Sequence, residues 1–522
     1  MERKWWTLIA VCVATFMLLL DITIVNVALP SIQADLNASL SSLQWVVDAY
    51  ALTLASFLLV FGSLGDRLGR RRIFSVGFAV FTVSSLLCGL AKDPTVLNFF
   101  RALQGVGAAA MFATALALIA QEFEGRERGT AIGVWGATVG GAVAVGPLVG
   151  GVITDALGWE WIFFVNVPIG IAAIVLTETR LANVAATDAQ PIDWAGVTTF
   201  SLSLFGLIFG LIRGNSEGWS SPQIVTSFAG AALLMIAFVA IQARRANAML
   251  DLRLFRVSSF GGVSIVAWAL SASMFAMFLY LTLYIQDVLG YQPLDAGIRF
   301  LPTTVLSFFV APISANLSDR IPVRVLMGLG LFLTGVGLFL MHGVQPGDSW
   351  TGLLPGFMVS GVGVGMVNPM IAETALGVVP PARAGMASGI NSTFRQIGIA
   401  TGVAGLGAVF SSRIASELTS HLSTAPAAVQ AHEGQLSDAV SSGAIHQALA
   451  NVPAKFHDQV QAAANASFIT AFNEILLIAA IVAVTGSVLG FLMVRKRDFV
   501  GSPQAQEPEE APGAPASPVP AG

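Results

Sequence analysis

Residues 62–72 read G-S-L-G-D-R-L-G-R-R-R, and this short stretch lies between two long apolar segments. It carries one acid, Asp66, and a cluster of arginines where the neighbouring sequence has almost no charge. Cytoplasmic loops of membrane proteins are enriched in Lys and Arg, and charges close to the ends of spans count most. We therefore expect this loop to face the cytoplasm, and it fixes the direction of every other segment.

The composition agrees with a membrane protein. Hydrophobic residues make up 55% of the 522 residues, and charged residues only 11%. A soluble domain carries about 25% charged residues, so this chain lacks the charge to cover a surface in water and belongs in a lipid bilayer. The net charge of −4 is small, and we expect no nucleic-acid partner. Cys12 and Cys88 both lie in apolar segments, so no disulfide framework is expected.

A helix needs about 20 mostly apolar residues to cross a bilayer. We find about fourteen such stretches and expect the first to be an uncleaved span. The predicted spans are 6–29, 44–64, 73–91, 95–119, 130–153, 161–178, 193–212, 224–243, 260–283, 297–316, 323–342, 351–372, 388–411 and 467–493. The sequence thus predicts an all-α polytopic membrane protein.

The distribution of cations places both termini in the cytoplasm. With this orientation the great majority of loop Lys and Arg residues fall on the cytoplasmic side, as expected for a correctly counted set of spans. The cations left outside are Lys92, Arg213, Arg299, Arg413 and Lys455.

Two segments outside the membrane stand out. Residues 412–466 form a long external loop, within which residues 437–450 have helical spacing. Residues 499–522 are rich in Pro, Ala and Glu with almost nothing to bury, which predicts a disordered cytoplasmic tail.

The chain also contains an internal repeat. The motif S-L-G-D-R-L-G-R-R ending at Arg71 aligns with N-L-S-D-R-I-P-V-R ending at Arg324, so that Asp66 matches Asp319. Two short cytoplasmic turns can share Asp-Arg by chance, but here the spacing and the position within each set of helices also agree. Two six-helix halves are a transporter architecture. We expect halves at 1–180 and 257–498, with two inserted transmembrane helices at 181–256.

Ionisable residues inside spans are hypotheses for functional sites. Asp21 lies nine residues before Pro30, or about 14 Å into the membrane, and Asp48 and Arg101 lie at comparable depth on neighbouring spans. Two acids and one arginine at this depth can form a proton or cation site; the alternative is a permanent salt bridge that only fixes helix packing. In the second half Glu474 occupies a comparable depth and joins this candidate coupling set.

Two other features of the spans are candidates for function. Glu373 and Arg395, near the inner ends of spans 12 and 13, can pair as an inner gate, unless each simply reaches the membrane surface. The fifth span is rich in small residues around a proline, which favours close helix packing and a bend. We expect these residues to shape a particular interface; they are Gly146, Pro147, Gly150 and Gly151.

The energy source is inferred by elimination. Lys4, Lys92, Lys455 and Lys496 are the only lysines, and none follows a glycine-rich phosphate loop, so the sequence has no P-loop for ATP. The five histidines lie at a span end or in the external loop, which argues against a buried metal centre or a histidine-based membrane enzyme. We expect no metal, no cofactor and no enzymatic activity, which leaves an ion gradient.

These residues resemble a known family, the fourteen-helix drug:proton antiporters of the major facilitator superfamily, over about residues 5–495. The signature loop is similar at Gly62, Gly65, Asp66, Arg67, Gly69, Arg70 and Arg71. Four further motifs are similar: L-D-I-T-I-V-N-V-A-L-P at 20–30, R-A-L-Q-G at 101–105, the antiporter glycines and Pro147 of the fifth span, and W-E-W-I-F-F-V-N-V-P-I-G at 159–170.

The resemblance implies proton-coupled export of hydrophobic or cationic drugs, antibiotics and dyes by alternating access. Asp21 would be the proton and cation site, and Asp66 would contact the cytoplasmic end of span 13. The implied protein is a monomer in the bacterial plasma membrane, whose partners are small molecules, protons and lipid, and which confers antibiotic resistance. Export of one metabolite, antibiotic or siderophore remains an alternative within transport, and a membrane enzyme or sensor an alternative outside it.

Overall fold

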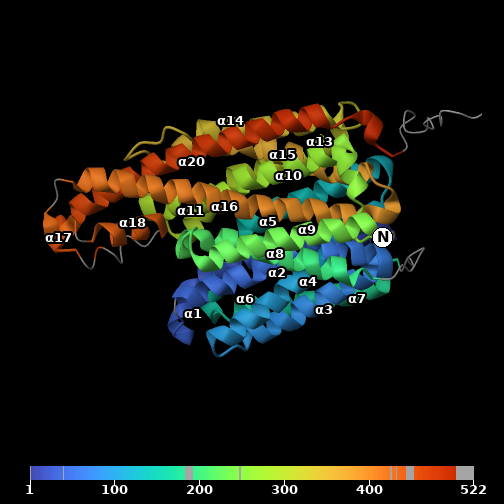
Figure 1. The fold of residues 1–522 in the computed structure, drawn as a ribbon, viewed down its shortest axis with the longest axis horizontal. Coiled ribbons are helices and arrows are strands. Elements are labelled where there is room, and N and C mark those ends of the chain that lie inside the picture. The colour runs from blue at the N-terminus through green and yellow to red at the C-terminus, as the bar shows by residue number, and fades with distance from the viewer. Residues whose placement is uncertain are drawn as a thin grey trace, which may run out of the picture.

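The computed structural model describes residues 2–38, 40–182, 192–245, 248–423, 426–430, 432–442, 449 and 452–500. Within these ranges every regular element is a helix, and the long helices run side by side (Figure 1). The helices of the N-terminal part are α1 (Arg3–Leu36), α2 (Leu40–Leu68), α3 (Arg70–Gly89), α4 (Pro94–Glu122), α5 (Gly125–Leu157), α6 (Trp161–Phe164) and α7 (Asn166–Arg180). Next come α8 (Trp194–Glu217) and α9 (Pro222–Arg244).

The C-terminal part repeats this arrangement with more interruptions. Its helices are α10 (Ser258–Leu270), α11 (Ala276–Leu283), α12 (Pro293–Arg299), α13 (Leu301–Leu317), α14 (Val323–Leu340), α15 (Leu354–Gly377), α16 (Ala384–Leu422), α17 (Ala427–Gln430), α18 (Glu433–Ser442) and α20 (His457–Met493). Two π-helical turns, Ser271–Phe275 and Tyr284–Val288, interrupt the path of α10 and α11. Short 3₁₀ turns η1 (Leu252–Arg256) and η5 (Pro381–Arg383) precede α10 and α16.

Twelve helices of the described chain are long and apolar enough to cross a membrane. Two shorter apolar segments, Leu148–Leu157 and Leu301–Leu317, overlap the predicted fifth and tenth spans. The prediction of a polytopic all-helical membrane protein is therefore confirmed.

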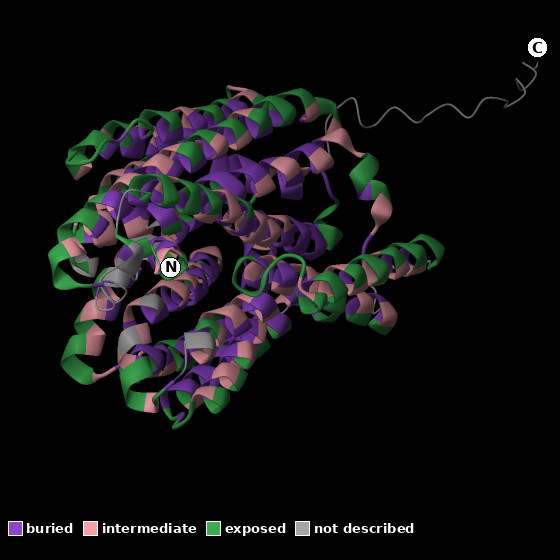
Figure 2. Ribbon diagram, turned by 60° about the vertical axis from the view of Figure 1, so that its left-hand side comes forward, coloured by how far each residue is buried: buried purple, intermediate pink, exposed green. Residues whose placement is uncertain are grey.

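The packing separates the N-terminal from the C-terminal helices. One apolar core is built almost wholly from residues 8–181, another from residues 263–494. A third, smaller core joins α8 and α9 to α2 and α16. Buried residues face the interior of the helix bundle, and many exposed ones lie on its outer faces (Figure 2). Exposed residues on α9 include large apolar side chains such as Leu233 and Ile236, as expected for a helix that faces lipid.

Close helix crossings at glycine occur at matching places in the two cores. In the α3–α4 crossing, a Cβ on Gly107 would lie 2.5 Å from the backbone nitrogen of Phe81. In the α14–α15 crossing, a Cβ on Gly363 would lie 2.5 Å from the carbonyl oxygen of Gly330. Small residues allow transmembrane backbones to approach in this way. Both crossings join the third and fourth long helices of their core.

The external segment is more helical than the prediction of a loop over 412–466. Helix α16 continues to Leu422, and α20 already begins at His457. The buried side chains Leu418, Leu436 and Val460 hold α16, α18 and α20 together, and this assembly lies at the opposite end of the molecule from the N-terminus (Figure 1). Of the predicted helical stretch 437–450, residues 443–448 and 450 lie outside the described residues.

The first two residues of the predicted tail pack against the end of α15. Val500 donates its backbone N–H to the carbonyl oxygen of Gly377 at 2.9 Å, and the ring of Phe499 packs on the same glycine. Residues 501–522, the rest of the predicted tail, lie outside the described residues.

The glycine crossings give a test of the packing. Gly107→Leu should separate α3 from α4 and lower the free energy of unfolding by about 1–3 kcal/mol, because overpacking a close contact forces backbone shifts. Gly230→Leu on α9 is the matched control, since nothing lies within 4 Å of a Cβ there. Thermal unfolding in detergent compares the two; equal transition temperatures would contradict the close crossing.

Candidate functional site

A dry ion pair lies between α1 and α4. Asp21 and Arg101 are each 1% exposed, and Arg101 Nη1 lies 2.5 Å from Asp21 Oδ2. Gln104 donates to Asp21 Oδ1 at 2.9 Å and accepts from Arg101 at 2.8 Å. A buried ion pair needs additional hydrogen bonds to offset desolvation, and Gln104 supplies them. Arg101 and Gln104 point the same way because residues three apart share a helix face.

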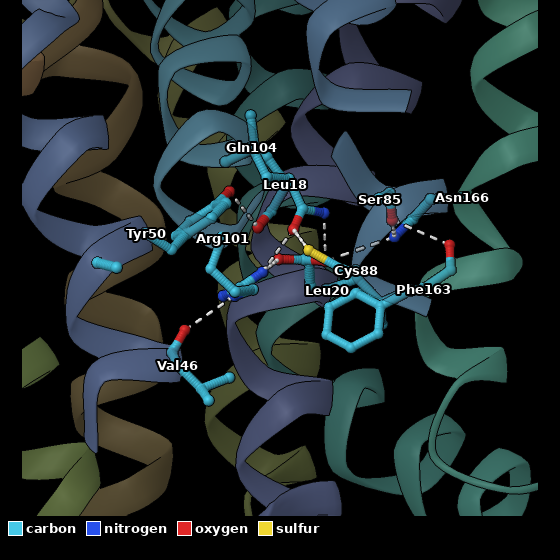
Figure 3. Close-up of polar contacts among 12 residues, drawn as sticks. Leu18, Leu20, Val46, Tyr50, Ser85, Cys88, Arg101, Gln104, Phe163 and Asn166 are labelled. Atoms are coloured by element: carbon cyan, nitrogen blue, oxygen red, sulfur yellow. Dashed lines mark hydrogen bonds and ion pairs between the residues drawn. The ribbon is translucent and has the colours of Figure 1, made fainter. Parts of the chain in front are cut away.

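Residues on the neighbouring helices surround the ion pair and fix the orientation of the Arg101 side chain (Figure 3). Arg101 Nε donates to the carbonyl oxygen of Val46 at 2.8 Å, and its guanidinium lies 4.4 Å from the centre of the Tyr50 ring. On the opposite side Asn166 approaches Asp21 at 3.4 Å and donates to Ser85 at 3.1 Å. The two charges are thus held by α2, α3 and α7 as well as by their own helices.

A proton on Asp21 would upset the charge balance of this ion pair. With Asp21 ionised, the two charges neutralise each other in a medium of low polarity. A proton on Asp21 would remove that partner and leave Arg101 as an uncompensated buried cation, which is strongly unfavourable. Protonation of this carboxyl therefore has to be accompanied by rearrangement or by another counter-charge.

Asp48 does not join this cluster. Its carboxylate lies 3.5 Å from Arg213 Nε, on α8. Arg213 is 5% exposed, donates to Gln44 at 3.0 Å and lies over the ring of Trp45. The expected group of two acids and one arginine is instead two separate ion pairs. Arg213, which we expected on the external side just beyond a span, is buried in the last two turns of α8.

The signature loop joins α2 to the start of α16. Asp66 Oδ1 accepts the backbone N–H of Gly385 at 2.9 Å, and Oδ2 accepts that of Met386 at 2.8 Å. These are the second and third residues of α16, whose N-terminal N–H groups have no partner within the helix and favour an anion. The predicted contact between Asp66 and the cytoplasmic end of span 13 is therefore present.

Glycines allow this approach. A Cβ on Gly62 would clash with the carbonyl oxygen of Gly385, so α2 and α16 touch backbone to backbone. A Cβ on Gly65 would lie 2.9 Å from the Thr114 side chain. Gly69 is the single residue between α2 and α3. Its φ of +100° is a conformation that favours glycine.

The arginines of the loop tie it to its surroundings. Arg70 lies 2.9 Å from Asp66 and donates to the carbonyl oxygen of Pro381 at 2.5 Å, so it too reaches the C-terminal helices. Arg71 pairs with Glu178 of α7 at 2.5 Å. Arg67 donates to the carbonyl oxygen of Ala248 at 2.9 Å.

The segment between α9 and α10 contacts both the end of α2 and the turn η5. Its Met249 carbonyl accepts from Ser63, and its Asp251 pairs with Arg383 at 2.5 Å. Burial alone would raise the pKa of Asp251, but hydrogen bonds from Arg383 and the Arg253 N–H outweigh it and hold the pKa below its usual range. The segment borders a cavity of about 1090 Å³. It therefore links α2 to η5 with a carboxylate that stays ionised at neutral pH.

The antiporter glycines pack on the helix that carries Asp21. A Cβ on Gly146 would clash with the Thr23 side chain, and one on Gly150 would lie 2.8 Å from Ile24. A Cβ on Gly151 would have no neighbouring heavy atom of the described chain within 4 Å. The side chain of Pro147 lies outside the described part of the chain. The interface shaped by these small residues is thus the one between α5 and α1.

The structure does not bring Glu373 and Arg395 together. Arg395 Nη2 donates to Asn368 Oδ1 at 2.6 Å, while Glu373 hydrogen-bonds with Ser318. Arg395 is eleven residues into α16, or about 16 Å, too deep to meet an acid one turn from the end of α15. The predicted inner gate is wrong in its pairing.

Glu474 is also placed differently. It pairs with Arg413 at 3.2 Å, and both side chains are nearly half exposed. From Met493 it lies nineteen residues up α20, or about 28 Å, close to the thickness of the hydrocarbon core. Glu474 therefore lies near the end of the span that is remote from Met493, and α20 begins ten residues earlier than expected.

Comparison with known proteins agrees with this geometry. The chain matches the Major Facilitator Superfamily over residues 11–403. The chain belongs to this superfamily. Superfamily membership makes it a transporter and not an enzyme.

Its relatives include named exporters. It is 37% identical over 428 residues to the multidrug resistance protein Stp of Mycobacterium tuberculosis, covering 82% of this chain and 80% of that one. It is 32% identical over 514 residues to the tetracenomycin C resistance and export protein of Streptomyces glaucescens, covering 98% and 94%. It is 36% identical over 431 residues to the puromycin resistance protein of Streptomyces alboniger, covering 82% and 85%.

Solved structures show the same fold at low identity. The human organic anion transporter MFSD10 superposes with a TM-score of 0.59 at 14% identity, covering 92% of this chain and all of that one. The proton:xylose symporter XylE superposes with a TM-score of 0.55 at 14% identity, covering 92% and 94%.

Several site residues were missed from the sequence. Gln104 and Asn166 are amides inside apolar spans, and the spacing of Gln104 from Arg101 placed both on one helix face. Asn368 and Arg213 gave weaker signals, because Asn368 pairs with a residue on the following long helix and Arg213 with one 165 positions earlier in the chain. A rule that every polar side chain within a span needs a partner would have marked Gln104, Asn166 and Asn368, but not Arg213, which lay just beyond a predicted span.

The antiporter glycines give a sharp comparison within one helix. Gly146→Val should push α1 away from α5 and reduce export more than about tenfold, since a clash of this kind costs about 1–3 kcal/mol where Asp21 is positioned. Gly151→Val should leave export near the native rate. Dye efflux from cells with matched protein levels measures both; equal loss in the two variants would contradict a specific role of the α1 contact.

The Asp66 contact predicts that a substitution at this residue shifts the equilibrium between the closed and the cytoplasm-open states. Asp66→Asn should favour the cytoplasm-open state by about tenfold or more, because a hydrogen bond to a charged group contributes about 1.5–3 kcal/mol. Distances between spin labels on Arg72→Cys and Ala382→Cys, with Cys12 and Cys88 replaced by serine, report the opening. Glu178→Gln is the control, since Glu178 pairs with Arg71 without touching α16. An unchanged distance distribution for Asp66→Asn would contradict the prediction.

Proposed function

We propose that this transporter exports hydrophobic and cationic small molecules, such as drugs, antibiotics and dyes, in exchange for protons. The observation that carries the proposal is the dry Asp21–Arg101 pair. A buried carboxylate whose protonation unbalances a buried arginine is a means of coupling a proton to helix movement. The exporters among the relatives support the direction and the class of substrate.

We infer that the fold comprises fourteen spans. Residues 1–180 and 257–498 form six-helix halves, and residues 181–256 supply two inserted spans. The separate apolar cores and the matching glycine crossings support this division. The protein then acts as a monomer in the bacterial plasma membrane with both termini in the cytoplasm; the basic signature loop supports this orientation.

The proposed cycle alternates two states. In the state described above, Asp66 holds the N-terminus of α16 and closes the cytoplasmic side. Proton arrival at Asp21 from outside would unbalance Arg101, shift α1 against α5 through the glycine contact, and help release the cytoplasmic contacts. Substrate would enter from the cytoplasmic side, and proton release would return the transporter to the closed state.

A dedicated exporter of a single compound is the second candidate. It is favoured by relatives named for one product each, such as the tetracenomycin C export protein and the cephamycin export protein of Amycolatopsis lactamdurans. An antibiotic or a siderophore would be such a product. Export of many unrelated dyes would decide for the broader function.

Asp21→Asn tests the coupling. In inverted vesicles with an acidic lumen, addition of a transported dye to native protein should raise the lumen pH, because protons leave as dye enters. Asp21→Asn should abolish this signal, since an amide cannot carry the proton. The exposed acid Asp458, changed to Asn, is the control and should behave as native. A normal proton signal in Asp21→Asn would remove Asp21 from the coupling path and move that role to Asp48.

A further inference from the structure

Three arginines are buried among the described residues, and they differ in their partners. Arg101 pairs with Asp21, and Arg213 pairs with Asp48. Arg395, 8% exposed, has one hydrogen bond, to the neutral amide of Asn368 at 2.6 Å. No carboxylate of the described chain lies within ion-pair distance of it. A buried charge without a counter-ion is costly, so an anion that binds next to Arg395 would be stabilised.

Other donors without acceptors lie on the same face of α16. Asn391 is one turn before Arg395 and Ser388 a further turn back, so the three share one face of the helix. Both are buried, and neither Asn391 Nδ2 nor Ser388 Oγ has a hydrogen-bond partner. Buried polar groups are normally paired. A face with a guanidinium, an amide N–H and a hydroxyl, all short of acceptors, fits a ligand that supplies oxygen acceptors and negative charge.

The opposite wall of this region is aromatic and reaches the N-terminal helices. Asn368, the partner of Arg395, lines a small cavity of about 20 Å³ together with Phe275, Phe278 and Val139 of α5. A Cβ on Gly136 of α5 would lie 4.0 Å from Asn368 Cβ, so the cavity lies where the two sets of helices meet.

The backbone around this cavity is also unusual. Ser271–Phe275 is a π-helical turn, an irregularity frequent at functional sites. Its Ser271 Oγ is buried without a partner, and Ser271 packs on Gly398, three residues beyond Arg395. The turn thus adds a further hydroxyl on the side of α16 that carries the arginine.

We propose that Arg395, with Asn391 and Asn368, binds the carboxylate of an aromatic organic anion at the interface between the two halves. The carboxylate accepts from the guanidinium and the Asn391 amide, and its aromatic body packs on Phe275 and Phe278. The small cavity is the closed form of this site, and it opens when the halves separate. The inference rests on the proposed export function and extends its substrates from cations to carboxylates.

The test uses a matched pair of probes, a xanthylium dye with a free carboxylate and the methyl ester of the same dye. Binding to purified native protein is followed by fluorescence anisotropy. Arg395→Gln should weaken binding of the carboxylate dye about tenfold to a hundredfold, the range for losing a charge-assisted hydrogen bond, and leave the ester within about twofold. Arg395→Lys should recover part of the loss. The exposed external arginine Arg413, changed to Gln, should change neither.

A second variant keeps the inference testable if Arg395→Gln fails to fold. Asn391→Asp places a carboxylate one turn from Arg395 and should compete with the dye, giving a similar selective loss. Equal losses for the two dyes in either folded variant, or native protein that binds the ester but not the carboxylate, would overturn the inference. The proposed export function is judged separately, by proton-coupled uptake of the ester in vesicles, so its failure is distinguishable from failure of the carboxylate site.

Discussion

A charge placed inside this helix bundle must find a counter-charge, and most of the functional geometry follows from that constraint. Asp21 and Arg101 neutralise each other in a dry space, with Gln104 accepting from one and donating to the other. Asp48 and Arg213 do the same between α2 and α8. Such pairs add little net stability relative to apolar side chains. A change of protonation or a competing ion at such a pair would alter which helices the pair holds together.

The contact between Asp66 and α16 combines a salt bridge with the partial charges of a helix N-terminus. Asp66 is bound by two N–H groups at the start of α16, in addition to Arg70. Those N–H groups can donate to a carboxylate only because Gly62 lets α2 meet Gly385 without a side chain between them. A carboxylate that binds a helix end can be released by a small rotation, since its hydrogen bonds are directional. A gate of this kind is strong when aligned and weak once α16 tilts.

The sequence predicted the membrane fold and the family, because these depend on local patterns, and the resemblance to that family implied the contact between Asp66 and span 13. Apolar length defines a span, and the arginines of residues 62–72 define its orientation. Asp21 and Arg101 were found because ionisable residues are rare in spans. The pairing of Asp48, Arg395 and Glu474 was not predictable in this way. It depends on which face a helix presents and on where α16 and α20 begin, and shifts of about ten residues in a helix start move a side chain across half the membrane.

Helix α8 and the segment after α9 are tied to the rest of the bundle by ion pairs and hydrogen bonds. Arg213 of α8 neutralises Asp48, so removal of α8 would leave a nearly buried carboxylate unpaired. The segment after α9 joins Ser63 and Arg67 to Arg383 through Met249, Ala248 and Asp251. Any separation of α2 from α16 on the cytoplasmic side must break or carry along these contacts. A hairpin that only filled space beside the bundle would need neither Arg213 near one end of α8 nor the contacts that the segment after α9 makes with α2 and η5.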